Sequence, residues 1–194
     1  MVSNRKIIEG CIKGKRRSFS LLYRKFAPVM LGVCMRYARN RSEAEDILQE
    51  GFIKVFMNIC RFRQEGSFEG WIRRIMINTA IDHYHKNRLV DFQSDFDHLN
   101  DIVDASQIQD DNKYNAYDLS CDTLLAMIRT LPPGYQLIFN LYAIEGCSHR
   151  EIADLLNISV STSKSQLFKA RKSVQKKIDE YSSKKIKDQH HEEG

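Results

Sequence analysis

Residues 148–172 read SHREIADLLNISVSTSKSQLFKARK, and this stretch decides the fold of the C-terminal part. Ser148 and Glu151 stand three residues apart, which is the spacing of a capping box at the start of a helix. The helix that they open is expected to bury Ile152, Ala153, Leu155 and Leu156. Residues 157–159 then form a short turn before a longer helix. A helix, a tight turn and a second helix are the order of a helix-turn-helix motif.

The longer helix has an apolar row and a polar face. Its inward row, at steps of three and four residues, is Val160, Ser163, Leu167, Ala170, Val174 and Ile178. Its outward residues are Ser161, Thr162, Lys164, Ser165, Gln166, Lys169, Arg171 and Lys172. These residue types reach phosphates and base edges in the major groove. A solvated basic face is the alternative, but the capped helix, turn and core spacing together favour binding to duplex DNA.

The first 90 residues also predict helices. Pro28 is expected to break or restart the first long helix, and Ser42 with Glu45 is expected to cap the next. That helix should turn inward Leu48, Phe52, Val55, Phe56 and Ile59. Its outward side should carry Glu43, Asp46, Gln49, Glu50 and Lys54. A third helix should bury the stripe Trp71, Ile72, Ile75, Met76 and Thr79. The expected fold class is therefore all-α.

The charge of the chain is unevenly distributed. The net charge of +5 divides into +10 for residues 1–90, −8 for 91–122 and +3 for 123–194. The aspartate-rich middle has no sustained hydrophobic period, which favours a linker. We therefore expect two small helical domains, 1–90 and 121–180, joined by an acidic flexible linker, 91–120, and followed by a disordered tail, 181–194. Two basic parts around an acidic one suggest binding to nucleic acid.

Several classes of function are disfavoured. The five cysteines are scattered singly, and neither a catalytic motif nor a metal-ligand spacing occurs, so we expect no catalytic residue, metal or cofactor. No apolar run approaches the roughly 18 residues of a membrane span, and the first residues do not resemble a signal peptide. We accordingly expect a cytoplasmic protein without direct membrane contact.

Basic and aromatic residues alternate between residues 61 and 88. Aromatic rings beside cations suit unstacked bases of single-stranded nucleic acid. An aromatic stripe at helical spacing is more often part of a core, however, and Phe68 and Trp71 would each be core residues more often than not. The acidic outward face of residues 43–50 also has two interpretations, a solvated surface or a protein-docking surface. Spacing alone favours the solvated surface.

Three segments in order resemble a bacterial RNA polymerase sigma factor of the extracytoplasmic-function (ECF) group. They are AEDILQEGFIKVF at 44–56, FRQEGSFEGWIRRIMINTAIDHYHK at 62–86 and LPPGYQLIFNLYAIEGCSHREIADLLNISVSTSKSQLFKARK at 131–172. The resemblance covers about residues 10–180. It implies a region 2 helical bundle and a region 4 helix-turn-helix, and a function in directing core polymerase to specific promoters and helping to open them.

The resemblance also implies roles for individual residues. Docking on the clamp of the beta-prime subunit would use Asp46, Ile47, Leu48, Gln49 and Glu50. Capture of the minus-ten element, with one base flipped into a pocket, would use Ser67, Phe68, Trp71, Arg73, Arg74, Asn78, Tyr84 and Lys86. Reading of the minus-thirty-five duplex would use Arg150, Ser161, Thr162, Lys164, Ser165, Gln166, Lys169 and Arg171.

Further partners follow from the same resemblance. The flap of the beta subunit is a second polymerase contact, and a separate anti-sigma factor is the usual inhibitor in the family. Two other functions remain as alternatives: a stand-alone helix-turn-helix regulator, and a nucleic-acid enzyme. The DILQE stretch at 46–50 distinguishes the sigma factor from the stand-alone regulator, because only the former needs a polymerase-docking face. An enzyme is disfavoured because no convergent set of acid, base or metal ligands is visible in the sequence.

Overall fold

A computed structural model describes residues 3–63, 65–90 and 119–192. Every regular element in these ranges is a helix, which confirms the all-α prediction. The chain forms two compact units, residues 1–91 and 92–194, and each is treated by itself. The predicted acidic linker lies outside the described residues except for its last two. Within the described ranges, no helix is long and apolar enough to cross a membrane.

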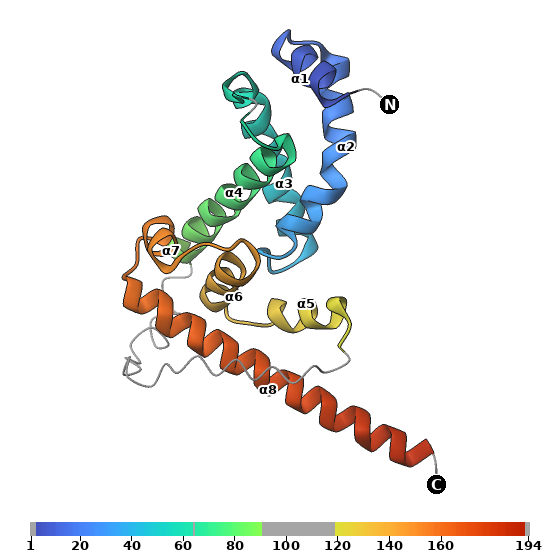
Figure 1. Ribbon diagram of the computed structural model, residues 1–194, viewed down its shortest axis with the longest axis vertical. Helices are drawn as coiled ribbons and strands as arrows, with labels where there is room; N and C mark the ends of the chain where they lie inside the picture. Colours follow the sequence, from blue (N-terminus) through green and yellow to red (C-terminus); the bar gives the residue numbers. More distant parts are fainter. Residues whose placement is uncertain (1–2, 64, 91–118, 193–194) are drawn as a thin grey trace. The chain divides into compact units, whose positions relative to one another are not determined.

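The described residues of the first unit form a bundle of four α-helices and one short 3₁₀ segment (Figure 1). Its elements are α1 (Asn4–Ile12), α2 (Arg16–Cys34), α3 (Arg41–Asn58), η1 (Ile59–Arg61) and α4 (Phe68–Val90). The helices α2, α3 and α4 pack against one another, and α1 packs on α2. Amphipathic helices of this kind are stabilised mainly by the packing of their apolar faces against one another.

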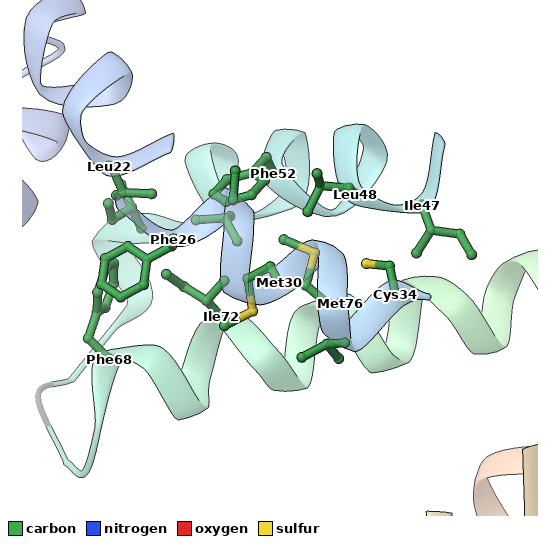
Figure 2. Packing of buried hydrophobic residues seen from close by; sticks show 14 of the residues in the cluster. Leu22, Phe26, Met30, Cys34, Ile47, Leu48, Phe52, Phe68, Ile72 and Met76 are labelled. Carbon is green, nitrogen blue, oxygen red and sulfur yellow. The ribbon is translucent and has the colours of Figure 1, made fainter. Parts of the chain in front are cut away.

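Buried side chains from all four α-helices form the core of this unit. Figure 2 shows the part where α2, α3 and α4 meet, with Met30, Leu48 and Met76 among the labelled residues. The predicted stripe of the third helix is confirmed, because Ile72, Met76 and Thr79 are fully buried and its other two members are half-buried. The apolar core thus fixes how α3 and α4 lie against each other.

Gly51 allows α3 and α4 to approach closely. A Cβ atom at this position would collide with the sulfur of Met76, which is itself fully buried. The sulfur could move only by displacing its neighbours in a close-packed core. The absence of a side chain at Gly51 therefore sets the separation of the two helices.

Two local predictions in this unit were wrong. The helix α2 runs through Pro28 without a break. Pro28 and Arg24 are both exposed, so water can reach the Arg24 carbonyl that loses its backbone donor. The helix α3 is capped by Asn40 rather than Ser42, since the Asn40 side chain accepts a hydrogen bond from the Glu43 backbone N–H at 2.9 Å. Asparagine and serine both favour the N-cap position, so the residue types alone did not decide between Asn40 and Ser42.

In the described part of the second unit, residues 119–192, the chain forms four α-helices and a π-helical segment. They are α5 (Cys121–Arg129), α6 (Pro133–Phe139), the π-helical η4 (Asn140–Ile144), α7 (His149–Leu156) and α8 (Val160–Glu192). Gly146, with a φ of 72°, turns the chain between η4 and α7. The helix α8 packs against α5, α6 and α7.

The predicted helix-turn-helix is present as α7, a short turn and α8 (Figure 1). Its capping box is confirmed, because the Ser148 side chain binds the Glu151 backbone N–H and the Glu151 carboxylate accepts from the Ser148 backbone N–H. Asn157 takes the left-handed conformation at the end of α7, with a φ of 52°. Asparagine tolerates this conformation better than most residues, so it can serve as the cap that glycine usually provides.

The row of buried residues differs from the prediction at its edges. Leu155 and Val160 were expected inside but are exposed, whereas Ile152, Ala153 and Leu156 are buried as predicted. A three-to-four-residue period defines an apolar face only to within one position, so residues at its border are ambiguous. The tail was expected to be disordered from residue 181, but α8 continues to Glu192. Its Lys, Gln and Glu residues favour a helix.

Candidate nucleic-acid and protein interfaces

The docking stretch on α3 divides into exposed and buried residues. Asp46 and Gln49 are exposed, whereas Ile47 and Leu48 are buried in the core. Figure 2 shows Ile47 and Leu48 on the side of α3 that faces the rest of the core. They can support a docking face from behind but cannot form its surface. Glu50 is intermediate, with one third of its side chain exposed.

Two apolar residues extend the exposed side of α3. Ile53 and Met57 are 57% and 74% exposed, and they follow Asp46 and Gln49 at helical spacing. Sequence reasoning did not single them out, although their distance from Gln49, four and eight residues, was a visible signal. A large exposed apolar residue is common by itself, but two on one stripe beside polar residues form a surface that suits a protein partner.

Glu50 is the centre of a charged cluster between α3 and α4. Its Oε2 lies 2.8 Å from His83 Nε2, and its Oε1 lies 3.0 Å from Lys54 Nζ and 3.7 Å from Lys86 Nζ. Lys54 Nζ also donates to Asp82 Oδ2 at 2.8 Å. The sequence predicted that Glu50 and Lys54 lie on the outward side of their helix, and it gave no sign of their contacts with α4.

The cluster alters the acidity of its two central residues. Burial raises the pKa of the Glu50 carboxyl, but the hydrogen bonds from Lys54 and His83 outweigh burial, and the net pKa is below its ordinary value. Burial lowers the pKa of Lys54, but the bonds to Asp82 and Glu50 raise its net pKa above the ordinary value. Both residues therefore stay charged near neutral pH.

Aromatic rings pack together at the start of α4. Phe68 is buried and contacts three rings, those of Phe26, Phe62 and Trp71, at centroid distances of 5.6, 4.9 and 5.7 Å. For Phe68, the core interpretation was therefore the right one, and its ring is not available to stack on a base. Trp71 is half-buried and keeps part of its ring at the surface. Ser67 starts the helix, since its Oγ accepts from the Gly70 N–H at 3.3 Å.

The other predicted minus-ten residues lie along α4. Arg74, Asn78 and Lys86 are exposed, and Arg73 and Tyr84 are half-buried. The ring of Tyr84 meets that of His85 edge-on at 5.7 Å. The structure thus presents cations, an amide and partly open rings along one helix, which are the groups that hold single-stranded nucleic acid.

The polar face of the helix-turn-helix is present with one exception. The exposed predicted residues are Arg150, Ser161 and Lys164, and the half-buried ones are Thr162, Ser165, Lys169 and Arg171. The Thr162 backbone N–H is bound by Ser159 Oγ at 2.9 Å, which caps α8. Ser165 donates to the Thr162 carbonyl at 3.1 Å, so its hydroxyl is partly committed to its own helix.

Gln166 is the exception, because it is buried with 8% of its surface exposed. It stands next to Leu167 on the border of the apolar row of α8, the helix that packs against α6 and α7. The expectation that Gln166 faces outward to read a base was therefore wrong. Its place on the helical wheel was ambiguous by one position, as it was for Val160.

A polar pair within the motif was also missed. Ser163 is fully buried, and its Oγ lies 2.9 Å from His149 Nδ1, which joins α8 to the first turn of α7. The His149 ring stacks on Tyr142 at 4.7 Å, and the Arg171 guanidinium lies 5.5 Å from the same tyrosine ring. Burial lowers the pKa of His149, and the charges of Lys164 and Arg171 lower it further. His149 is therefore neutral at neutral pH, which suits its hydrogen bond to a hydroxyl.

Two families match the chain in the order of the two units. Residues 22–90 match the family described as Sigma-70 region 2, and residues 121–174 match Sigma-70, region 4. The first match spans α3 and α4. The second includes α7, the turn that follows it and the beginning of α8.

Curated relatives match over nearly the whole chain. The RNA polymerase sigma-H factor of Pseudomonas aeruginosa is 29% identical over 186 residues, which covers 90% of this chain and 93% of the relative. The ECF RNA polymerase sigma-E factor of Haemophilus influenzae is 28% identical over 188 residues, covering 91% and 96%. A solved structure of a sigma factor in complex with an anti-sigma factor, from Bartonella quintana, has a TM-score of 0.49 and 16% identity, covering 84% and 98%.

Proposed function

Because the chain belongs to the sigma-70 family as an ECF RNA polymerase sigma factor, we propose that its two units divide the work of promoter recognition. The first unit, with α3 and α4, docks on core polymerase and captures the minus-ten element. The second unit, with α7 and α8, reads the minus-thirty-five element. The observation that carries this proposal is the capped helix-turn-helix within the region 4 match, preceded in the chain by the region 2 match.

The polymerase-docking face is proposed to be the exposed stripe of α3. Asp46 and Gln49 supply its polar contacts, and Ile53 and Met57 supply an apolar continuation. Ile47 and Leu48 hold the stripe against the core. A polar contact fixes orientation, while a partly apolar face supplies affinity by burial. The partner is the clamp of the beta-prime subunit, and the flap of the beta subunit is assigned to the second unit.

Capture of the minus-ten element is proposed to use the start and the surface of α4. Ser67 and Trp71 lie at its first turns, and the residues further along are Arg73, Arg74, Asn78, Tyr84 and Lys86. Unstacking a base costs a few kcal/mol, and contacts to its ring and edge offset this cost. Phe68 holds Trp71 in place from within the core and does not itself meet the base.

Reading of the minus-thirty-five duplex is proposed to use the beginning of α8. The contacting residues are Arg150, Ser161, Thr162, Lys164, Ser165, Lys169 and Arg171. Ser161 and Lys164 lie at the exposed N-terminal turns, which enter the major groove in this motif. Gln166 supports the helix from the packed side, so its loss should affect stability more than base preference.

Family membership supports further proposals about the chain. We propose that it acts in the cytoplasm as an initiation factor without a catalytic residue, cofactor or metal of its own. A separate anti-sigma factor is proposed as its inhibitor. These statements rest on family membership, since the family consists of transcription initiation factors.

The proposal is tested by transcription with purified core polymerase. The chain should direct specific initiation on promoters selected from random DNA by the holoenzyme, and core polymerase alone should not. The double variant Asp46→Ala with Gln49→Ala should abolish association with core polymerase and leave binding of the full chain to minus-thirty-five duplex intact. Unchanged association would defeat the docking assignment and favour a stand-alone regulator.

A further inference from the structure

The structure describes the side chains of α4 over residues 68–87, and the apolar ones that pack in the core all lie in the first half of the helix, up to Ile81. Phe68, Ile72, Met76, Ala80 and Ile81 are buried. Over 82–87 every residue is polar or aromatic and none is buried. Among the described side chains of α4, apolar burial therefore holds the first half of the helix, up to Ile81. The second half carries Tyr84 and Lys86, two of the proposed minus-ten contacts, and other interactions must set its direction.

Polar contacts with α3 replace apolar packing along this second half. Lys54 holds Asp82 at 2.8 Å, and Glu50 holds His83 at 2.8 Å and Lys86 at 3.7 Å. Two turns of α3 further toward its N-terminus, Glu43 Oε1 accepts from Asn87 Nδ2 at 2.9 Å. The contacts of Asp82 and His83 at 2.8 Å are hydrogen bonds that involve charged groups, which are stronger than neutral ones, and the contact of Lys86 at 3.7 Å is a longer ion pair. These contacts tie four residues of α4, within the span 82–87, to α3.

Glu50 stands at the centre of these contacts, and both of its oxygen atoms are in use. One oxygen is bound to His83, and the other is shared by Lys54 and Lys86. Asp46, one turn earlier on the same helix, is exposed, and no residue in the described part of this unit forms an ion pair or hydrogen bond with its carboxylate. A cation of a partner protein could reach Asp46 directly, but it would have to displace groups of this chain from Glu50.

We propose that Glu50 is a positioning residue that holds the second half of α4, with Lys86, in the orientation that the minus-ten element requires, and that it is not itself a polymerase contact. This inference rests on the proposed function, because it takes Lys86 as a DNA contact. It revises the assignment of the DILQE stretch: Asp46 and Gln49 face the polymerase, and Glu50 faces the DNA-binding helix. The stretch therefore serves both interfaces from one turn of α3.

The experiment compares Glu50→Gln with the matched control Glu45→Gln. Glutamine keeps the size of the side chain and removes its charge, and Glu45 lies on the same helix, paired only with Arg41 at 2.8 Å among the ion pairs described. The probe is a promoter selected by the wild-type holoenzyme, with its minus-ten segment unpaired. Glu50→Gln at saturating core polymerase should weaken binding of this probe about three- to tenfold, which lies in the lower part of the range of coupling energies within one charged network. Glu45→Gln should not change it.

Two readouts separate positioning from a polymerase contact and from a loss of fold. The affinity of Glu50→Gln for core polymerase should stay within about twofold of the wild type. A change of this size is no larger than the deviation from additivity seen for independent sites. Loss of core affinity as large as that of Asp46→Ala would overturn the proposal. In a double-mutant cycle, Glu50→Gln should have little further effect on probe binding once Lys86→Met is present. Additive losses would also overturn it.

The outcomes distinguish this inference from the proposed function itself. If Lys86→Met leaves probe binding unchanged, the minus-ten assignment of that residue fails, whatever Glu50 does. If Lys86→Met weakens binding and the cycle is additive, the assignment stands and only the positioning of Lys86 by Glu50 fails. A second cycle with His83→Phe covers the case that Glu50→Gln does not fold, because it removes a partner of the carboxylate and leaves the carboxylate in place. Coupling of His83→Phe to Lys86→Met supports the proposal, and additivity overturns it.

Discussion

The two helices that are proposed to meet DNA are held in place by different kinds of contact. The second half of α4 is held by a half-exposed charged cluster around Glu50, whereas the beginning of α8 is held by an apolar row and the buried Ser163–His149 hydrogen bond. Charged contacts near solvent weaken with salt, but buried neutral contacts hardly respond. The comparison indicates that the single-strand-binding helix is adjustable and the duplex-binding helix is fixed.

Removal of apolar volume tests the contacts that hold the beginning of α8 and has no counterpart over residues 82–87 of α4. Ile152 on α7 is fully buried, so Ile152→Ala should destabilise the helix-turn-helix by about 2–5 kcal/mol. Chemical denaturation followed through the second unit measures the change. No buried apolar residue is available for the corresponding test over 82–87 of α4. A loss well below 1 kcal/mol would show that the apolar row does not hold the motif.

The buried polar pair gives the next largest effect. Ser163→Val should cost about 1–3 kcal/mol, because it leaves the Nδ1 of His149 without its partner. The double variant Ser163→Val with His149→Leu should recover much of the loss, since removing both polar partners can be nearly neutral. Unfolding free energies of the two single variants and the double variant decide the point. Equal losses in the single and double variants would mean that the hydrogen bond does not matter.

The pH dependence should separate the two sites. The pKa of His149 is lowered on folding, so the unfolded chain takes up a proton first and the second unit loses stability as the pH falls below the ordinary histidine value of 6.5. The pKa of Glu50 is also lowered, but its contribution is complete above the ordinary value of 4.5 and is lost only as the pH falls through the lower folded value. Denaturation of His149→Gln beside the wild type, between about pH 8 and about pH 5, should show a flatter profile for the variant.

Salt should give the smallest effect and sharpen the comparison most directly. Raising the ionic strength from about 0.05 M to about 0.5 M should speed hydrogen exchange at residues 82–87 of α4 and leave residues 152–156 of α7 unchanged. The change on α4 should correspond to about 0.5 kcal/mol, as for ion pairs that are partly exposed. The variant Glu50→Gln should lose this salt response. Equal responses of the two segments would remove the distinction.

The sequence was a good guide to elements whose causes are local. The capping box of Ser148 and Glu151, the turn at Asn157 and the buried Ile72 and Met76 depend on spacing within one helix, and all were predicted correctly. Residues at the border of an apolar face were not, because a period of about 3.6 residues leaves one position of uncertainty. Leu155, Val160 and Gln166 all stand at such borders.

Contacts between helices could not be predicted from spacing at all. Glu50 and His83 are 33 residues apart, and His149 and Ser163 are 14 apart, so their meeting depends on how two helices cross. The residue types gave only weak signals, since Glu50 belonged to a docking motif and His149 to a helix start. The resemblance to sigma factors indicated which stretch matters, but which way each side chain faces within the stretch had to come from the packing.

The close crossing at Gly51 has a consequence for how the chain tolerates change. In a library of all single substitutions, position 51 should accept fewer residues than its exposed neighbours Ile53 and Met57. Yet Gly51 is buried and offers no surface to the polymerase or to DNA. A ranking of positions by tolerance would therefore place it among the functional residues, although what it determines is the spacing between a docking surface and a DNA-binding surface.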